Sequence, residues 1–128
     1  MYLLPKPKKI EKRQDSYEIS WNTVITIDGA LSENGCVYAG ILQERIRRYA
    51  GIECAVVRGE KRKRDIFLTL TPACGAQEYQ IHIDRDGIVI AGGDGAAVLS
   101  GVQPLCQLLA QCGGVLEGMD SADAPDIR

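Results

Sequence analysis

The sequence predicts an α+β fold, in which two helices pack on one face of a mostly antiparallel sheet. Two segments, residues 33–51 and 95–112, repeat their apolar residues at helical spacing. Strand-like segments follow one another directly along much of the chain, whereas a parallel doubly wound sheet would alternate strands with helices. The Asp86-Gly87 dipeptide joins two of these segments and suits the positive φ of a tight turn, which indicates an antiparallel hairpin.

The N-terminal part of the chain is expected to be extended. Pro5 and Pro7 disfavour a helix at the start. Residues 17–21 alternate between apolar and polar side chains, and residues 23–28 are mostly β-branched and apolar. Both patterns predict strands.

The first helix is expected over residues 33–51. Ser32 can cap its start, and Gly51 suits the left-handed conformation that ends many helices. Three arginines lie mostly on the side opposite its apolar residues. The apolar residues at helical spacing are Val37, Ile41, Leu42, Ile46 and Tyr49.

Two further strands, residues 52–58 and 65–71, flank a basic segment over residues 58–64. Residues 1–64 carry 13 Lys and Arg against 8 Asp and Glu, although the whole chain has a net charge of −2. A nucleic-acid interface is one interpretation of this excess. The basic residues of such an interface would be Arg58, Lys61, Arg62, Lys63 and Arg64. Because no aromatic residues are interleaved to stack on bases, we favour a solvated hairpin loop and expect no nucleic-acid partner.

A hairpin and a second helix complete the fold. Apolar and polar residues alternate along the first hairpin arm, residues 78–84, so one of its faces is packed and the other solvated. The second arm is expected over residues 87–92 and the helix over residues 95–112, where Pro104 should introduce a kink. Residues 113–118 are short and strand-like. The apolar stripe of the helix comprises Val98, Val102, Leu105, Leu108 and Leu109.

The glycine-rich turn at residues 92–95 could indicate a phosphate site, because a strand, a glycine turn and a helix also build such sites. The dinucleotide pattern G-x-G-x-x-G fails here at its third glycine, where Val98 stands. A P-loop is excluded because no lysine occurs beyond Lys63. Asp94 suits the start of a helix as a cap. We therefore predict a tight turn with close helix–sheet packing and no cofactor.

The remaining candidate sites are weak. His82 is the only histidine and lies on the polar face of the hairpin, where a surface role is expected. Asp84, Asp86 and Gly87 resemble part of a calcium loop, but its third acidic ligand and distal glutamate are missing. The carboxylates form no convergent pair of the kind used in glycoside hydrolysis. We assign no catalytic, cofactor-binding or metal-binding residue.

Length and cysteine usage indicate a single reduced domain. The 128 residues suit one compact unit, and the five cysteines, which include no C-x-x-C pair, argue against a disulfide framework. We expect most of these thiols to be buried. No apolar run approaches the ~20 residues that cross a bilayer, and the apolar stretch before Pro5 is too short for a signal peptide. A cytoplasmic protein without a membrane partner is expected.

Three segments together resemble a known domain. The opening LLPKPKKIE contains a Pro-x-Pro pattern, and residues 78–109 contain a Tyr-led hairpin, a turn of small residues and a helix. The end of the chain, SADAPDIR, contains Asp123 and Pro125 in an Asp-x-Pro segment. The matching helix residues are Gly101, Val102, Gln103, Leu105, Gln107, Leu108 and Leu109. This combination resembles the non-catalytic domain that precedes the catalytic barrel in glycoside hydrolase family 20.

The resemblance implies that residues 1–118 form an α+β accessory domain and that residues 119–128 form an extended linker towards a catalytic barrel outside this chain. Members of the family are β-N-acetylhexosaminidases, which remove terminal N-acetylhexosamine from glycans. Their His-x-Gly-Gly-Asp-Glu motif belongs to the barrel, so this chain alone carries no catalytic residue. Pro104 departs from the family pattern, in which a residue such as threonine is usual.

The implied role is structural support and a docking surface for the β/α-barrel, with the amino-sugar substrate bound by the barrel only. The isolated domain should then expose an apolar patch or hide it by self-association. Two alternatives stay open. One is the related N-terminal domain of a family 84 N-acetylglucosaminidase, and the other is a stand-alone carbohydrate- or nucleic-acid-binding module.

Overall fold

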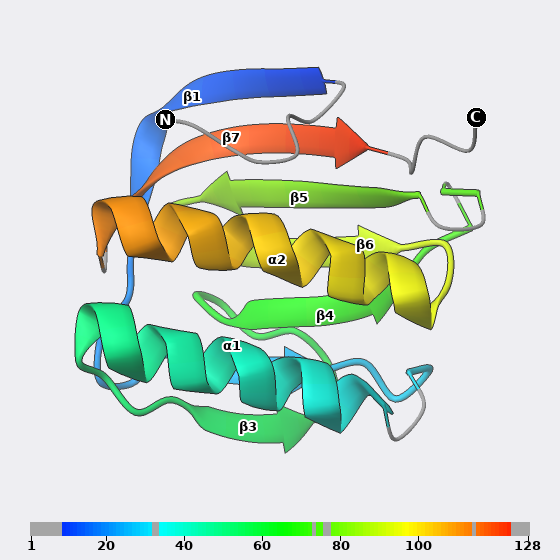
Figure 1. The fold of residues 1–128 in the computed structure, drawn as a ribbon, viewed down its shortest axis with the longest axis horizontal. Coiled ribbons are helices and arrows are strands. Elements are labelled where there is room, and N and C mark those ends of the chain that lie inside the picture. Colours follow the sequence, from blue (N-terminus) through cyan, green and yellow to red (C-terminus); the bar gives the residue numbers. More distant parts are fainter. Residues whose placement is uncertain (1–8, 32–33, 73, 76–77, 114, 124–128) are drawn as a thin grey trace.

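The computed structural model describes the chain apart from residues 1–8, 32–33, 73, 76–77, 114 and 124–128. Two helices lie in front of one broad sheet (Figure 1). In chain order the elements are β1 (Lys9–Glu18), β2 (Val24–Ile27), α1 (Asn34–Ala50), β3 (Ala55–Arg58), β4 (Ile66–Leu70), β5 (Tyr79–Asp84), β6 (Gly87–Gly92), α2 (Gly95–Cys112) and β7 (Val115–Asp123).

The strands form one sheet in the order β1-β7-β5-β6-β4-β2-β3. The pairs β1–β7, β7–β5 and β5–β6 are antiparallel, and the pairs β6–β4, β4–β2 and β2–β3 are parallel. The antiparallel pairs are the longer ones, so most residue pairs in the sheet are antiparallel. Both helices cover the same face (Figure 1), and the predicted α+β class is confirmed.

The strands on either side of the basic segment do not form the hairpin that we predicted. β2 lies between β3 and β4 and is parallel to both, so residues 59–65 form a crossover. The parallel pairing of β2 with β3 is possible because α1 returns the chain between them. Strand patterns in the sequence show that these segments are extended but do not identify their partners.

The predicted β5–β6 hairpin is confirmed, with Asp84 opposite Gly87. Gly87 has φ +142°, and a Cβ atom there would lie 2.5 Å from the carbonyl oxygen of Asp65. The turn therefore requires glycine for both its conformation and its close contact with the crossover.

Both helices end as the sequence predicts. α1 ends before Gly51, which has φ +73° and donates its N–H to the Arg47 carbonyl. α2 ends before Gly113, whose N–H is bonded to Leu109. Pro104 lies buried inside α2, which continues on both sides of it. The predicted cap Ser32 lies outside the described residues.

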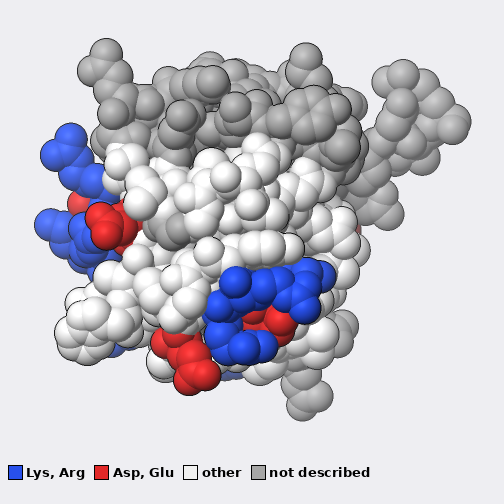
Figure 2. Space-filling view, turned by 60° about the vertical axis from the view of Figure 1, so that its left-hand side comes forward, with Lys and Arg blue, Asp and Glu red and all other residues white. Residues whose placement is uncertain are grey.

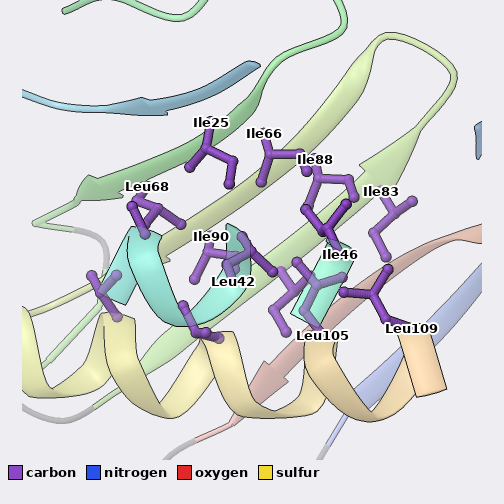
Figure 3. Packing of buried hydrophobic residues seen from close by; sticks show 14 of the residues in the cluster. Ile25, Leu42, Ile46, Ile66, Leu68, Ile83, Ile88, Ile90, Leu105 and Leu109 are labelled. Atoms are coloured by element: carbon purple, nitrogen blue, oxygen red, sulfur yellow. The ribbon is translucent and has the colours of Figure 1, made fainter. Parts of the chain in front are cut away.

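The hydrophobic core lies between the helices and the sheet. Leu42 and Ile46 of α1, together with Leu105 and Leu109 of α2, point towards the aliphatic residues of the strands (Figure 3). Ile, Leu, Val and Ala supply most of it, because the chain has few aromatic residues. The labelled strand residues that meet the helices are Ile25, Ile66, Leu68, Ile83, Ile88 and Ile90.

The last strand is longer than the sequence pattern indicated. β7 runs to Asp123 and pairs with both β1 and β5, so it includes residues 119–123 of the segment predicted as a linker. Residues 124–128 lie outside the described residues. Strand pairing on both sides holds this acidic segment in the sheet. The residue pattern of the segment itself does not indicate a strand.

Candidate docking surface

The glycine turn before α2 is built for close backbone contact. A Cβ atom on Gly93 would lie 1.9 Å from the carbonyl oxygen of Gly75, and one on Gly92 would lie 2.8 Å from the amide nitrogen of Val98. Neither backbone neighbour can yield without moving the chain. Steric packing therefore explains the glycines, as the sequence predicted.

Three backbone N–H donors at this turn bond within the chain. The Asp94 carboxylate accepts the N–H of Ala97 at 2.8 Å, and the Asp94 carbonyl accepts the N–H of Val98. The Gly93 N–H donates to the carbonyl of Glu78. Asp94 is thus the N-cap of α2, and its negative charge occupies the place where a phosphate would bind.

The hairpin end carries His82 and two aspartates. The Nε2 atom of His82 lies 2.6 Å from a carboxylate oxygen of Asp84, and the other oxygen of Asp84 accepts the N–H of Asp86. These bonds shape a tight turn of the predicted hairpin. Among the described residues, no three His, Cys, Asp or Glu side chains are grouped to hold a metal ion.

The basic segment is largely tied to its own fold. Arg58 donates to the Leu31 carbonyl at 2.7 Å, and Lys61 donates to the Asp86 carbonyl. Arg62 lies 3.5 Å from the buried carboxylate of Asp65. Lys and Arg side chains gather in separate groups on the surface, with uncharged surface between them (Figure 2). These contacts hold the crossover in place and direct three of the cations towards the protein's own oxygen atoms.

The cysteines are free thiols, but most of them are not buried, contrary to the prediction. Cys54 is buried, Cys74 and Cys106 are half-buried, and Cys36 and Cys112 are exposed. Burial raises the pKa of Cys54 to about 11, and the pKa of Cys106 to about 11. The prediction was wrong for Cys36 and Cys112 because each lies near a helix end, where neighbouring apolar residues in the sequence do not enclose it.

The outer face of α2 is unusually poor in charge, and two apolar residues of α1 are exposed beside it. α2 has no charged residue along its 18 positions, although Gln103 and Ala110 on its outer side are exposed. On α1, Val37 is 59% exposed and Ile41 is 37% exposed. Depletion of charge together with exposed apolar side chains is typical of the centre of a protein interface.

A groove of about 540 Å³ runs between the outer sides of the helices. Arg45 is the charged residue in its lining. The lining residues are Ile41, Arg45 and Tyr49 of α1 with Leu99, Gln103, Cys106, Gln107 and Ala110 of α2. The groove therefore combines apolar side chains with the amide groups of Gln103 and Gln107, which can donate and accept hydrogen bonds.

Charge at the C-terminal end of α1 is unbalanced. The Glu44 carboxylate lies 3.6 to 3.8 Å from the guanidinium groups of Arg45, Arg47 and Arg48. One carboxylate thus serves three cations, and each pair is too long for a strong charge-assisted hydrogen bond. Cations also suit the end of a helix, where the macrodipole is negative. Of these four charged residues, Arg45 lines the groove.

Neither described helix has both the length and the apolar composition needed to cross a membrane. This finding agrees with the uneven polarity of α1 and α2, whose inner faces pack on the sheet.

Sequence comparison identifies the family. The family described as glycosyl hydrolase family 20, domain 2, matches residues 1–124. The chain belongs to this family. It is an N-terminal, non-catalytic domain of a family 20 enzyme, as the resemblance implied. A search of curated proteins returned no match.

Solved structures share the fold. The family 20 β-N-acetylhexosaminidase of Streptomyces coelicolor is similar with a TM-score of 0.82 and 26% identity, over 96% of this chain and 26% of that one. The β-hexosaminidase of Streptomyces plicatus is similar with a TM-score of 0.78 and 24% identity, over 94% and 26% respectively. The chain therefore spans about a quarter of the length of these hexosaminidases.

The fold alone does not separate family 20 from family 84. A protein named CpGH84D is similar with a TM-score of 0.74 and 11% identity, over 96% of this chain and 24% of that one. The family match decides in favour of family 20. Sequence reasoning did not identify the groove, although the uncharged stretch from Gly95 to Cys112 was a usable signal.

Proposed function

We propose that this accessory domain supports a β/α-barrel that removes terminal N-acetylhexosamine from glycans, and that the outer face of α1 and α2 is its docking surface. The uncharged outer face of α2 is the observation that carries the proposal. A helix exposed to water in a small domain normally carries charged residues on its outer face. Here that face is polar only through glutamines and a serine.

The groove gives the interface a centre. Ile41 and Leu99 line it from opposite helices, and Tyr49 adds a half-exposed aromatic ring. Interfaces between domains of one chain bury ~600–1,500 Å², and they use apolar centres with polar rims. The sheet covers the opposite faces of both helices, so the helix layer would lie between the sheet and the barrel.

The amino-sugar substrate would be bound by the barrel alone. In the described part of the domain no three His, Cys, Asp or Glu side chains are grouped, and the Asp94 cap lies at the glycine turn. The purified chain should give no turnover of a chromogenic N-acetylglucosaminide above buffer. Clear turnover by the chain alone would contradict the structural role.

Co-expression tests the docking surface. The 128-residue chain, carrying an affinity tag, would be produced with the barrel of its parent enzyme as a second polypeptide. Ile41→Asp places a charge at the groove and should reduce recovery of the barrel at least 10-fold. Val57→Asp is the matched control, because Val57 is 38% exposed, close to the value for Ile41, and lies on β3 away from the groove. Equal recovery with both variants would contradict the proposal.

A nucleic-acid-binding module is less well supported. Three of its five basic residues, Arg58, Lys61 and Arg62, bond to the protein's own carbonyl or carboxylate oxygens. No aromatic side chain is interleaved with them in the sequence.

A further inference from the structure

The two edges of the sheet differ in how they are protected. β1 forms one edge, is rich in charged and polar residues, and changes register between Lys12 and Ser16. Charges and irregular register are features that keep edge strands from pairing with other chains. β3 forms the other edge, where Ala55, Val56 and Val57 pair with β2 in unbroken register. The main feature that limits pairing of β3 with another chain is its length of four residues.

The backbone N–H and C=O groups of alternate residues in β3 point away from the sheet. Gly59 donates its N–H to the carbonyl of Ile27 on β2. In a parallel pair the residues that bond to a given neighbour alternate along the strand. The backbone N–H and C=O groups of Val57 therefore point towards β2, as the N–H of Gly59 does. Those of Val56 point away from β2. A second strand could bond to Val56 without disturbing the pairing of β2 with β3.

Two side chains beside this edge bond to carbonyl groups of residues other than Val56. Gln43 donates its Nε2–H to the carbonyl of Cys54 at 2.6 Å, so the residue before the strand is held by α1. Arg58 turns its guanidinium group back to the Leu31 carbonyl. A hollow of about 570 Å³ lies between α1 and the start of β3, lined in part by Arg47 and Glu53.

We propose that two copies of this chain pair through β3, antiparallel and with Val56 opposite Val56 on a twofold axis. In this register Ala55 of each copy faces Val57 of the other, so apolar residues meet on both sides of the axis. Arg58 of each copy faces Cys54 of the other. Glu53 of each copy lies opposite Gly59 of the other, next to its Arg58. Moving the twofold axis from Val56 to Arg58 would set Arg58 against Arg58, and like charges directly opposite are unfavourable.

The resulting assembly is a continuous sheet with the helices of both copies on one face. The hollow between α1 and β3 then faces its counterpart across the axis. Because β3 has only four residues, the contact is smaller than the ~1,200 Å² of stable interfaces, and the pairing is transient. It uses a surface separate from the proposed docking groove, and either proposal can fail without the other.

Sedimentation equilibrium of the whole chain tests the pairing. The average mass should rise towards twice that of the monomer between ~10 µM and ~1 mM, as expected for a small interface. Val56→Pro removes the outward N–H and no bond to β2, and it should shift the dissociation constant at least 10-fold. Ile41→Asp should leave it unchanged. A monomer at every concentration, or a dimer lost through Ile41→Asp and kept in Val56→Pro, would overturn the proposal.

Crosslinking decides the outcome if Val56→Pro does not fold. Directly opposite hydrogen-bonded residues have Cα atoms ~5.5 Å apart, which suits a disulfide. In a Cys36→Ser, Cys112→Ser background, Val56→Cys should crosslink to a dimer at least 10-fold faster than Trp21→Cys. Trp21 is the more exposed position, at 85%, so collision alone would favour it. Equal or slower crosslinking of Val56→Cys would contradict the β3 pairing.

Discussion

The hydroxyl of Tyr17 donates a 2.6 Å hydrogen bond to the backbone carbonyl of Arg64, which joins β1 to the crossover before β4. Arg64 has φ +70°, a left-handed conformation that costs energy for a residue with a side chain. Its N–H donates to the Asp86 carbonyl at 2.7 Å, and its guanidinium lies 5.9 Å from the centre of the Tyr17 ring. These contacts hold the crossover against the hairpin.

Replacing Tyr17 by Phe should destabilise the fold by about 1–2 kcal/mol, because the Arg64 carbonyl loses its donor while the packed ring is kept. Burial raises the pKa of Tyr17, so its hydroxyl remains a donor at neutral pH. Urea unfolding measures the change. Tyr49→Phe, at a half-exposed ring, is the control and should change stability by less than about 0.5 kcal/mol. Equal effects would contradict the anchoring role of Tyr17.

Gly101→Ala should destabilise the protein by about 1–3 kcal/mol although alanine favours helices. A Cβ atom there would lie 2.7 Å from the Cγ2 methyl of Ile90 and 3.2 Å from the Tyr79 ring. Gly40→Ala in α1 meets no atom within 4 Å and should stabilise by up to about 1 kcal/mol. Thermal unfolding of both variants measures these opposite signs. Stabilisation by Gly101→Ala would show that α2 does not pack this closely on the sheet.

Asp28 should contribute to the loss of stability in acid. The N–H of Ala30 and the hydroxyl of Thr69 both bond to its carboxylate and lower the pKa of Asp28 from its ordinary value of 3.8. A lowered folded pKa gives stability that is present above that ordinary value and lost as the pH falls through the lowered one. Urea midpoints between pH 5 and ~2 should therefore change less in Asp28→Asn. Glu60→Gln, at an exposed carboxyl, is the control. If it reduced the pH dependence of the urea midpoint as much as Asp28→Asn does, the result would contradict this assignment.

Thiol labelling should separate the cysteines. Cys112 is exposed, whereas burial raises the pKa of Cys106 to about 11. Because the thiolate is the reactive form, iodoacetamide at pH 7.5 should label Cys112 about 100-fold faster than Cys106. Mass spectrometry of peptides measures both rates in one sample. Similar rates in the folded protein would show that α2 does not shield Cys106.

The basic segment should bind nucleic acid weakly or not at all. Arg58, Lys61 and Arg62 already bond to oxygen atoms of the protein, so a phosphate backbone would have to compete with these bonds for each of the three side chains. Fluorescence anisotropy with single-stranded DNA at ~20 mM salt should show no association below ~100 µM. Binding that weakens steeply with salt would support the nucleic-acid-binding module instead.

Local signals in the sequence predicted the parts of the fold that depend on neighbouring residues. The β5–β6 hairpin follows from Asp86-Gly87, the start of α2 from Asp94, and the end of α1 from Gly51. The place of β2 between β3 and β4 could not be predicted in this way, since strand partners are set by long-range packing. The same holds for β7, whose acidic residues remain in the sheet because β1 and β5 pair with it on both sides.

The proposed docking surface was only partly visible in the sequence. The family resemblance implied that one would exist, and the apolar stripe of α2 correctly gave its inner face. The groove itself depends on how α1 and α2 lie beside each other, so that Ile41 and Leu99 line the same groove. That distance between helices is set by the sheet beneath them and has no local signature.

The most direct test is hydroxyl-radical footprinting, which measures how accessible the groove residues are. It would be applied to the isolated chain and to a longer protein that also contains the barrel. Docking through the helix face predicts that oxidation of Tyr49 and Leu99 falls at least fivefold in the longer protein. Trp21, which is 85% exposed and outside the groove, should be oxidised equally in both. Unchanged oxidation of Tyr49 and Leu99 beside a folded barrel would contradict the account.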